Sequence, residues 1–151
     1  MKKFYILLLF LQFLFIGASA QSGWQYVSPT IPLPAAICND TYFVNDLTGW
    51  VVGNKILKTT DGGSSWNIQL SPLTLNAISM INTQYGFVCG EQGSILLTLN
   101  GGTNWLEVNS SGISANFKDM CFLNGTTGFA VSDSGRIFKT TDGAVTWTTQ
   151  K

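Results

Sequence analysis

The chain has 151 residues, of which 45% are hydrophobic and 13% aromatic, and it carries 8 basic and 8 acidic side chains but no histidine. This length suits one ordinary domain, and the balanced charge leaves no basic footprint for nucleic acid or for anionic lipid. The three cysteines form neither a CxxC pair nor a Cys/His cluster, so no zinc-site pattern is present.

The first twenty residues have the layout of a cleaved secretory signal. Two lysines precede an apolar run over residues 4–16, and Ala18 and Ala20 then form an A-x-A site before Gln21. The run is shorter than the ~20 residues that span a bilayer. We therefore expect an exported protein (periplasmic, cell-surface or extracellular) without residues 1–20 and with no membrane span. Loss of the two lysines leaves 6 basic against 8 acidic side chains.

Three segments of the remaining chain repeat one pattern. Each has a glycine followed by an aromatic residue, then a short apolar run, then a turn that ends in tryptophan. These tryptophans, Trp66, Trp105 and Trp147, are 39 and then 42 residues apart, and Trp24 precedes the first by 42. A period near 40 fits helical pairs or propeller blades. Short β-branched and aromatic runs between Gly, Asn, Asp and Ser clusters favour strands.

The predicted fold class is all-β: a partial β-propeller of three four-stranded blades plus one extra N-terminal strand, within residues 21–151. In chain order we expect a lone strand at 24–28 and blades at about residues 36–70, 76–109 and 117–151. Strand one of each blade is expected at Thr41–Val44, Ala77–Ile81 and Lys118–Leu123. Strand two begins at the Gly–aromatic pair, strand three at the following isoleucine and strand four at the tryptophan.

The turn before each tryptophan matches the Asp box, S/T-x-D-x-G-x-T/S-W. The first copy is complete, the second has Asn for Asp, and the third has Ala144 in the Gly position. The box residues are Thr59, Asp61, Gly63, Ser65, Trp66, Thr98, Asn100, Gly102, Trp105, Thr140, Asp142, Thr146 and Trp147. The carboxylate can accept hydrogen bonds from its own turn, glycine permits a left-handed backbone, and we expect the tryptophan ring in the core.

These boxes resemble those of the BNR/Asp-box propellers. The run from Gly49 to Trp66 is most similar to the photosystem II assembly and stability factor family and its bacterial relatives. The resemblance extends over residues 24–147 and implies a propeller and a role in assembling a membrane complex. In that family an arginine-bearing surface engages the photosystem subunit, and the single arginine of this chain is Arg136.

No residue pattern points to catalysis, to a cofactor or to a metal. A sialidase needs several arginines for its substrate carboxylate, and an ordinary glycosidase needs two carboxylates facing one bond. The acids outside the boxes share no motif; they are Asp40, Asp46, Glu91, Glu107, Asp119 and Asp133. We expect the box aspartates to be turn-formers.

The sequence therefore predicts a non-enzymatic secreted scaffold that binds protein or an extracellular polymer such as glycan through its loops. Two alternatives stay open, a fragment of a larger Asp-box glycoside hydrolase and a photosystem II assembly factor-like protein. Three blades leave a sheet face open at each end, which predicts self-association or further blades downstream. Export would permit a disulfide among Cys38, Cys89 and Cys121. The odd count, and the apolar strand patterns around Cys89 and Cys121, favour buried free thiols over that alternative.

Overall fold

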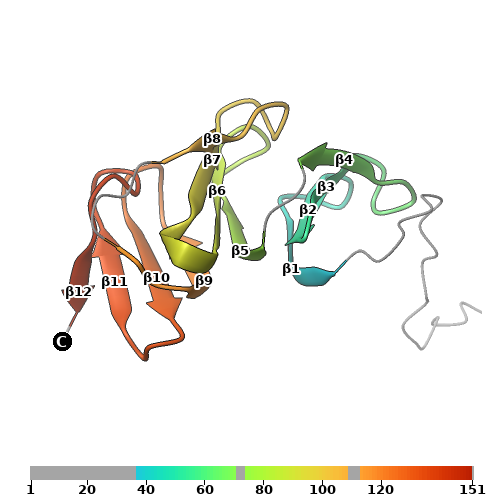
Figure 1. The fold of residues 1–151 in the computed structure, drawn as a ribbon. Coiled ribbons are helices and arrows are strands. Elements are labelled where there is room, and N and C mark those ends of the chain that lie inside the picture. Colours follow the sequence, from blue (N-terminus) through green and yellow to red (C-terminus); the bar gives the residue numbers. More distant parts are fainter. Residues whose placement is uncertain (1–36, 71–73, 109–112, 151) are drawn as a thin grey trace, which may run out of the picture.

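The chain forms three four-stranded antiparallel sheets (Figure 1). The computed structural model describes residues 37–70, 74–108 and 113–150. Neighbouring strands in each sheet follow one another in chain order, so every sheet is a simple meander. We call the sheets blade 1 (β1–β4), blade 2 (β5–β8) and blade 3 (β9–β12). The predicted all-β, partial-propeller class is confirmed; the lone strand predicted at 24–28 lies outside the described residues.

The strand bounds are as follows. Blade 1 contains β1 (Cys38–Phe43), β2 (Gly49–Gly53), β3 (Ile56–Thr59) and β4 (Asn67–Leu70). Blade 2 contains β5 (Leu75–Met80), β6 (Gly86–Gly90), β7 (Ile95–Thr98) and β8 (Leu106–Glu107), with the 3₁₀ turn η1 (Glu91–Gly93) between β6 and β7. Blade 3 contains β9 (Phe117–Phe122), β10 (Gly128–Ser132), β11 (Ile137–Thr140) and β12 (Thr148–Gln150).

The fourth strand of each blade begins one residue after the box tryptophan, not at it as predicted. In blade 1 the Trp66 indole N–H donates to the carbonyl of Gly63 at 3.1 Å, and Trp147 makes the same bond to Ala144 in blade 3. These bonds hold the tryptophans of blades 1 and 3 within their turns. The first strands also begin earlier than predicted, at Cys38, Leu75 and Phe117.

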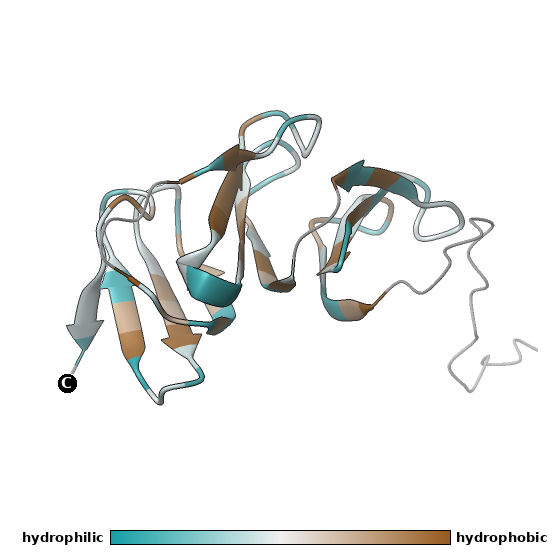
Figure 2. Cartoon of the chain, viewed as in Figure 1, coloured by the Kyte–Doolittle hydropathy of each residue, from teal (hydrophilic) through white to brown (hydrophobic). Residues whose placement is uncertain are grey.

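Each blade has two faces, and the strand register decides which residues share one. We call the face toward the next blade along the chain the front and the opposite face the back. In blade 2, Phe87 pairs with Ser79 and Leu97 on the front, and Val88 pairs with Ile78 and Leu96 on the back. Both faces of β6 are covered, so all five residues of Gly86–Gly90 are buried. Figure 2 shows the apolar colour of the neighbouring β7.

Two apolar cores lie between the blades. The front of blade 1 packs on the back of blade 2 through Trp50, Val52, Ile56, Leu75, Ile78, Met80, Val88 and Leu96. The front of blade 2 packs on the back of blade 3 through Ala77, Phe87, Cys89, Ile95, Phe117, Met120, Phe122, Ala130 and Phe138. The rings of Phe87 and Phe122 stack across this second boundary with centroids 3.8 Å apart. Each boundary therefore resembles a sandwich core built from alternate strand positions.

The same polar contact recurs at both blade boundaries. The Asn39 side-chain amide donates to the Leu75 carbonyl at 2.7 Å, and Asn76 donates to the Phe117 carbonyl at 2.7 Å. The Asp40 carboxylate accepts from the Thr41 amide in β1 at 2.7 Å and from the Ile78 amide of blade 2 at 2.9 Å. The inner strands β1, β5 and β9 thus lie against one another, which sets the blades side by side (Figure 1).

The box tryptophans are only partly buried, which corrects the expectation that they form the core. Trp105 and Trp147 pack against the edges of the two cores. Trp66 lies on the back of blade 1, where no described blade covers it, and its ring meets Phe43 edge-on at 6.1 Å. The fully buried large ring of blade 1 is instead Trp50, at 0% exposure.

The cysteines also differ in part from expectation. All three are free thiols, but only Cys89 is buried. Burial raises the pKa of the Cys89 thiol, so it is held in the neutral, unreactive form. Cys121 is exposed because it lies on the front of blade 3, at the position of the buried Ser79 in blade 2. Cys38 is exposed at the start of β1.

The predicted secretory signal, residues 1–20, lies outside the described residues. Within the described ranges there is no helix with the length and apolar character needed to cross a membrane.

Candidate functional site

Each Asp box is organised around a buried threonine hydroxyl. Thr59 Oγ1 accepts from the Gly63 amide at 2.9 Å and donates to an oxygen of Asp61 at 2.8 Å. That same aspartate oxygen accepts from the Ser65 amide at 2.9 Å. Every donor lies within four residues of its acceptor, so the turn is specified by its own sequence.

The other two boxes repeat this network with substituted residues. In the second box the Asn100 side-chain oxygen accepts from Thr98 and from the Asn104 amide, as a carboxylate oxygen would. In the third box Ala144 has φ +71°, in the left-handed region that Gly63 and Gly102 adopt at +89°. Its methyl group is fully buried in the core between blades 2 and 3, which offsets part of the backbone cost.

The box carboxylates are stabilised in their ionised form. The Ser65 hydroxyl and amide, together with Thr59, lower the pKa of Asp61 to about 2. Hydrogen bonds from the Thr146 hydroxyl and amide likewise lower the pKa of Asp142. A general acid near neutral pH needs a raised pKa, so these two groups are suited to holding a turn and not to proton transfer.

Acid should therefore weaken the boxes in a defined pH window. The folded-state pKa of each aspartate lies below its unfolded value of ~3.9, so its stabilising contribution is complete above that pH and is lost as pH falls through the lowered folded-state pKa, which for Asp61 is about 2. We expect the double variant Asp61→Asn, Asp142→Asn to lose less stability between about pH 4 and pH 2 than the parent chain. Urea unfolding across this range measures the difference.

The natural second box supplies the matched control. Asn100 does not titrate, and Asn100→Asp creates a third carboxylate in the same turn geometry. This variant should be more acid-sensitive than the parent chain. An equal loss of stability on acidification in the parent chain, the double variant and Asn100→Asp would show that acid acts on groups outside the boxes.

The acids outside the boxes lie apart or are engaged in structural contacts. Asp40 bridges blades 1 and 2, and the Asp133 carboxylate accepts from the Asn116 side chain at 2.8 Å. Asp119 accepts from the Met120 amide at 2.8 Å. Among the described residues there is no group of three His, Cys, Asp or Glu side chains that could hold a metal ion.

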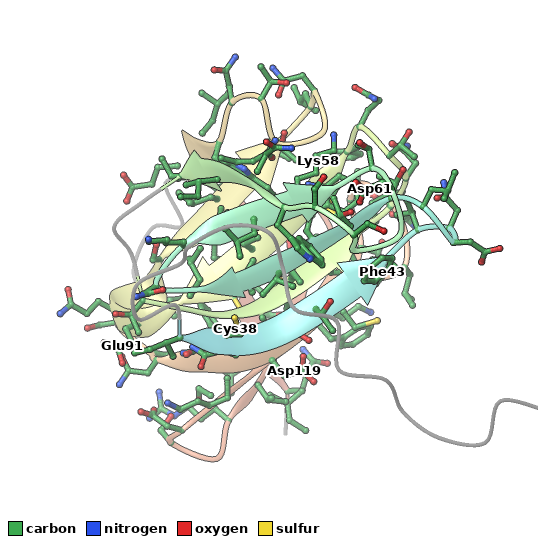
Figure 3. The ribbon with its side chains drawn as sticks, turned by 90° about the vertical axis from the view of Figure 1, so that its right-hand side faces the viewer. Cys38, Phe43, Lys58, Asp61, Glu91 and Asp119 are labelled. Carbon is green, nitrogen blue, oxygen red and sulfur yellow. The ribbon has the colours of Figure 1, made fainter. Side chains whose placement is uncertain are left out.

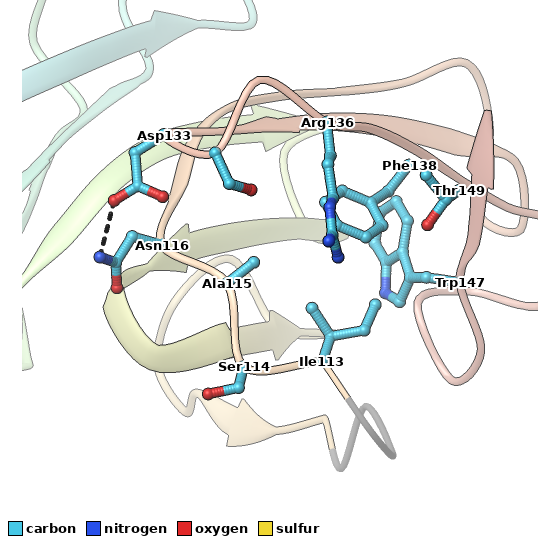
Figure 4. A pocket seen from close by; sticks show the side chains of 10 residues that line it. Ile113, Ser114, Ala115, Asn116, Asp133, Arg136, Phe138, Trp147 and Thr149 are labelled. Atoms are coloured by element: carbon cyan, nitrogen blue, oxygen red, sulfur yellow. Dashed lines mark hydrogen bonds between the residues drawn. The ribbon is translucent and has the colours of Figure 1, made fainter. Parts of the chain in front are cut away.

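A cleft of about 540 Å³ lies at the edge of blade 3. It lies between the turn before β11 and the segment at residues 113–116 that leads into β9. Its lining residues are Ile113, Ser114, Ala115, Asn116, Asp133, Ser134, Arg136, Phe138, Trp147 and Thr149 (Figure 4). The cleft thus combines one cation, two aromatic rings and several small polar groups.

Arg136 is the ligand-binding candidate within this cleft. Figure 4 shows its side chain pointing into the cleft beside Phe138 and Trp147, on the far side from the Asn116–Asp133 pair. Asn116 also accepts from the Gln92 amide at 2.9 Å, so the wall that carries Asp133 is tied to blade 2. Asp133 is therefore engaged by Asn116, and the guanidinium faces the open cleft.

Sequence reasoning missed this cleft because its walls come from segments that are separate in the sequence, the linker into β9 and the later strands and turns of blade 3. A weak signal was present, since Arg136 and Lys55 both precede the first residue of a third strand, where blade 2 has Ser94. The residues of the linker into β9, which complete the cleft, carry no motif.

Comparison with known proteins identifies relatives of this chain. The family described as photosynthesis system II assembly factor YCF48 matches residues 16–150. The chloroplastic photosystem II stability/assembly factor HCF136 of Arabidopsis thaliana is 30% identical over 141 residues, which are 83% of this chain and 34% of that protein. The chain thus spans about a third of the length of this curated relative.

Solved structures support the same fold. The structure of YCF48 bound to D1 peptide has a TM-score of 0.66 and 24% identity, covering 76% of this chain and 41% of that one. An ancestral GH74 enzyme is similar at a TM-score of 0.59 and 18% identity, covering 73% of this chain and 18% of that one, which shows a shared fold alone. The family model and the curated relative confirm the predicted family resemblance: this chain belongs to the photosystem II assembly factor YCF48 family of β-propellers.

Proposed function

We propose that this chain is a non-enzymatic protein-binding module that takes an extended peptide segment of a partner protein at the Arg136 cleft. The observation that carries the proposal is the Arg136 guanidinium facing an open cleft beside Phe138 and Trp147. Family membership supports a protein partner, since the similar YCF48 structure is described as bound to D1 peptide. This assembly-factor-like role replaces polymer binding as the favoured reading.

The chemistry of the cleft selects for an acidic side chain with apolar neighbours. A planar guanidinium binds a carboxylate through two parallel hydrogen bonds. The rings of Phe138 and Trp147 offer apolar surface to the carbon atoms on either side of that carboxylate. Thr149 belongs to β12, the outermost strand of blade 3, whose free edge is suited to an extended peptide.

The hydrolase alternative receives less support. The two boxes that contain an aspartate use its carboxylate to hold a turn, and Asp40 and Asp133 are engaged in contacts between segments. The similarity to the GH74 enzyme extends to the fold alone.

We also propose that the module acts after export, because the first twenty residues have the layout of a secretory signal.

Binding is tested with a fluorescein-labelled peptide that carries one glutamate between apolar residues, and with its glutamine counterpart. Fluorescence anisotropy should show that Arg136→Gln weakens binding of the glutamate peptide by roughly tenfold or more. The affinity of Arg136→Lys for this peptide should lie between those of the parent chain and Arg136→Gln. The glutamine peptide should bind weakly to all three proteins.

Lys55→Gln is the matched control, because Lys55 precedes β3 as Arg136 precedes β11 and its loss removes the same charge. It should leave binding unchanged. Equal losses for Lys55→Gln and Arg136→Gln would mean that only net charge matters, and no preference for glutamate would refute the site.

A further inference from the structure

The second Asp box differs from the other two at both positions whose side chains pair. In the first box the Ser65 hydroxyl donates to the second carboxylate oxygen of Asp61 at 2.6 Å, and the third box repeats this bond. The second box has asparagine at both positions, and the Asn100 oxygen is used to hold the turn. Within the described residues, the Asn100 NH₂ group and the Asn104 side-chain amide are therefore left for other partners.

The tryptophan of the second box also lacks a bond that its equivalents make. The indole N–H of Trp66 and that of Trp147 each donate to a carbonyl of their own turn at 3.1 Å. The Trp105 indole nitrogen is buried without a partner among the described residues, and so is the side-chain oxygen of Gln69 in β4 of blade 1. Buried polar atoms are nearly always hydrogen-bonded, so this donor and this acceptor call for a further group.

The two unpaired atoms lie close to one point beside Gly102. A Cβ added to Gly102 would overlap the Gln69 oxygen and lie 3.1 Å from the Trp105 indole nitrogen. At the boundary between blades 2 and 3, Ala144 has the place of Gly102, and Val108, three residues after the box tryptophan, has the place of Gln69. Both of these side chains pack in the apolar core there. The boundary between blades 1 and 2 thus holds an amide where the next boundary is filled with methyl groups.

A cleft of about 490 Å³ lies at this point, between β4 and the second box. Its lining combines Gln69, Trp105, Thr103 and the two asparagines with three leucines, and none of these side chains is charged. The cation that reaches the second box is Lys58 of β3, labelled in Figure 3, and it donates to a box carbonyl at 2.8 Å and lies outside the lining. The cleft thus offers apolar surface and amide groups without charge.

We propose that this cleft binds a neutral carbohydrate, with one sugar hydroxyl placed between the Gln69 side-chain oxygen and the Trp105 indole N–H. A hydroxyl oxygen accepts one hydrogen bond and donates another, so a single atom satisfies both groups. A peptide backbone carries its donor and its acceptor on separate atoms. The two asparagine amides are suited to neighbouring hydroxyls, and the exposed leucines of the lining are suited to the C–H face of a sugar ring.

Access to the unpaired atoms depends on Gln69. Its side chain is half-buried and lines the cleft from the outer strand of blade 1, so it can turn and admit the hydroxyl. The cleft shares no lining residue with the Arg136 cleft, so the proposal adds a second ligand and does not rest on peptide binding.

The test follows the indole N–H signals of the isotope-labelled chain by NMR while neutral hexasaccharides are added in turn: cellohexaose, maltohexaose and xylohexaose. The Trp105 signal, assigned with Trp105→Phe, should shift with at least one of them, and the Trp66 signal should stay in place. Because no charged side chain lines the cleft, the affinity should be the same at low and at high salt. If none of the three shifts the Trp105 signal, the point holds water only and the proposal is overturned.

Two variants bring this boundary closer to the pattern of the others. The double variant Asn100→Asp, Asn104→Thr recreates the side-chain pair of the third box, so it should fold and should bind the sugar roughly tenfold or more weakly. Gln69→Leu removes the acceptor for the hydroxyl and should weaken binding by a similar factor. If Gln69→Leu does not fold, the double variant still tests the cleft.

Gln150→Leu is the matched control, because Gln150 has the place of Gln69 in blade 3 and lies outside both clefts. It should leave sugar binding unchanged. Parent-like affinity in the double variant contradicts the proposal. So does an equal loss in Gln69→Leu and Gln150→Leu, because the sugar would then not depend on this boundary.

Discussion

Phe87→Ala is expected to lower the free energy of unfolding by about 3–5 kcal/mol, the usual cost of deleting a buried large aromatic ring. Phe87 is 0% exposed, and its ring stacks on Phe122 at 3.8 Å and contacts Tyr85 at 5.3 Å. Removing it leaves a cavity in the core between blades 2 and 3, where both sheets are held at fixed spacing and cannot collapse. Guanidinium unfolding monitored by tryptophan fluorescence measures the loss.

Phe129→Ala is the matched control, because Phe129 has the same place in blade 3 but none of the described blades covers it. Its ring is half-buried and lies under Lys139. We expect a loss of about 1 kcal/mol, set by partial burial. The measurement is made at low protein concentration so that any association does not contribute. Similar losses for the two variants would contradict the assignment of the front of blade 3 as an open face.

Gly93→Ala should be the second strongly destabilising change, at about 3 kcal/mol or more. Gly93 has φ +76°, and a Cβ there would lie 2.1 Å from the backbone carbonyl oxygen of Ile113. The Gly93 amide also donates to the Ala115 carbonyl at 2.7 Å, so the turn cannot move away without losing this bond. The variant therefore combines backbone strain with a clash against main-chain atoms. Thermal unfolding and urea titration measure its effect.

Gly135→Ala separates these two contributions. Gly135 is the corresponding glycine of blade 3, with φ +72°, and apart from its two chain neighbours no residue has an atom within 4 Å of where its Cβ would be. Only the left-handed backbone cost of about 1–2 kcal/mol applies there. If Gly93→Ala lowers the free energy of unfolding no more than Gly135→Ala does, the linker into β9 can move to accommodate the new methyl group, and the clash with the Ile113 carbonyl contributes nothing.

The repeat, the strands and the box turns follow from the sequence because their interactions are local. In each box the threonine, the aspartate or asparagine, and the amides they bond lie within four residues of one another. Short turns between the strands of each repeat favour pairing of consecutive strands as a meander, which is the order that each sheet has. The fold class and the family were therefore accessible without any tertiary information.

The tertiary structure alone decided which copies of each repeated residue are buried. Phe87 and Phe129, Ser79 and Cys121 are equivalent in sequence, yet one member of each pair is covered and the other is not. The difference depends on whether another blade lies in front, which no local pattern encodes. The Arg136 cleft is of the same kind, since its walls combine the linker into β9 with the turn before β11. Burial of the repeated residues arises from contacts between blades, and such contacts join residues about 40 positions apart.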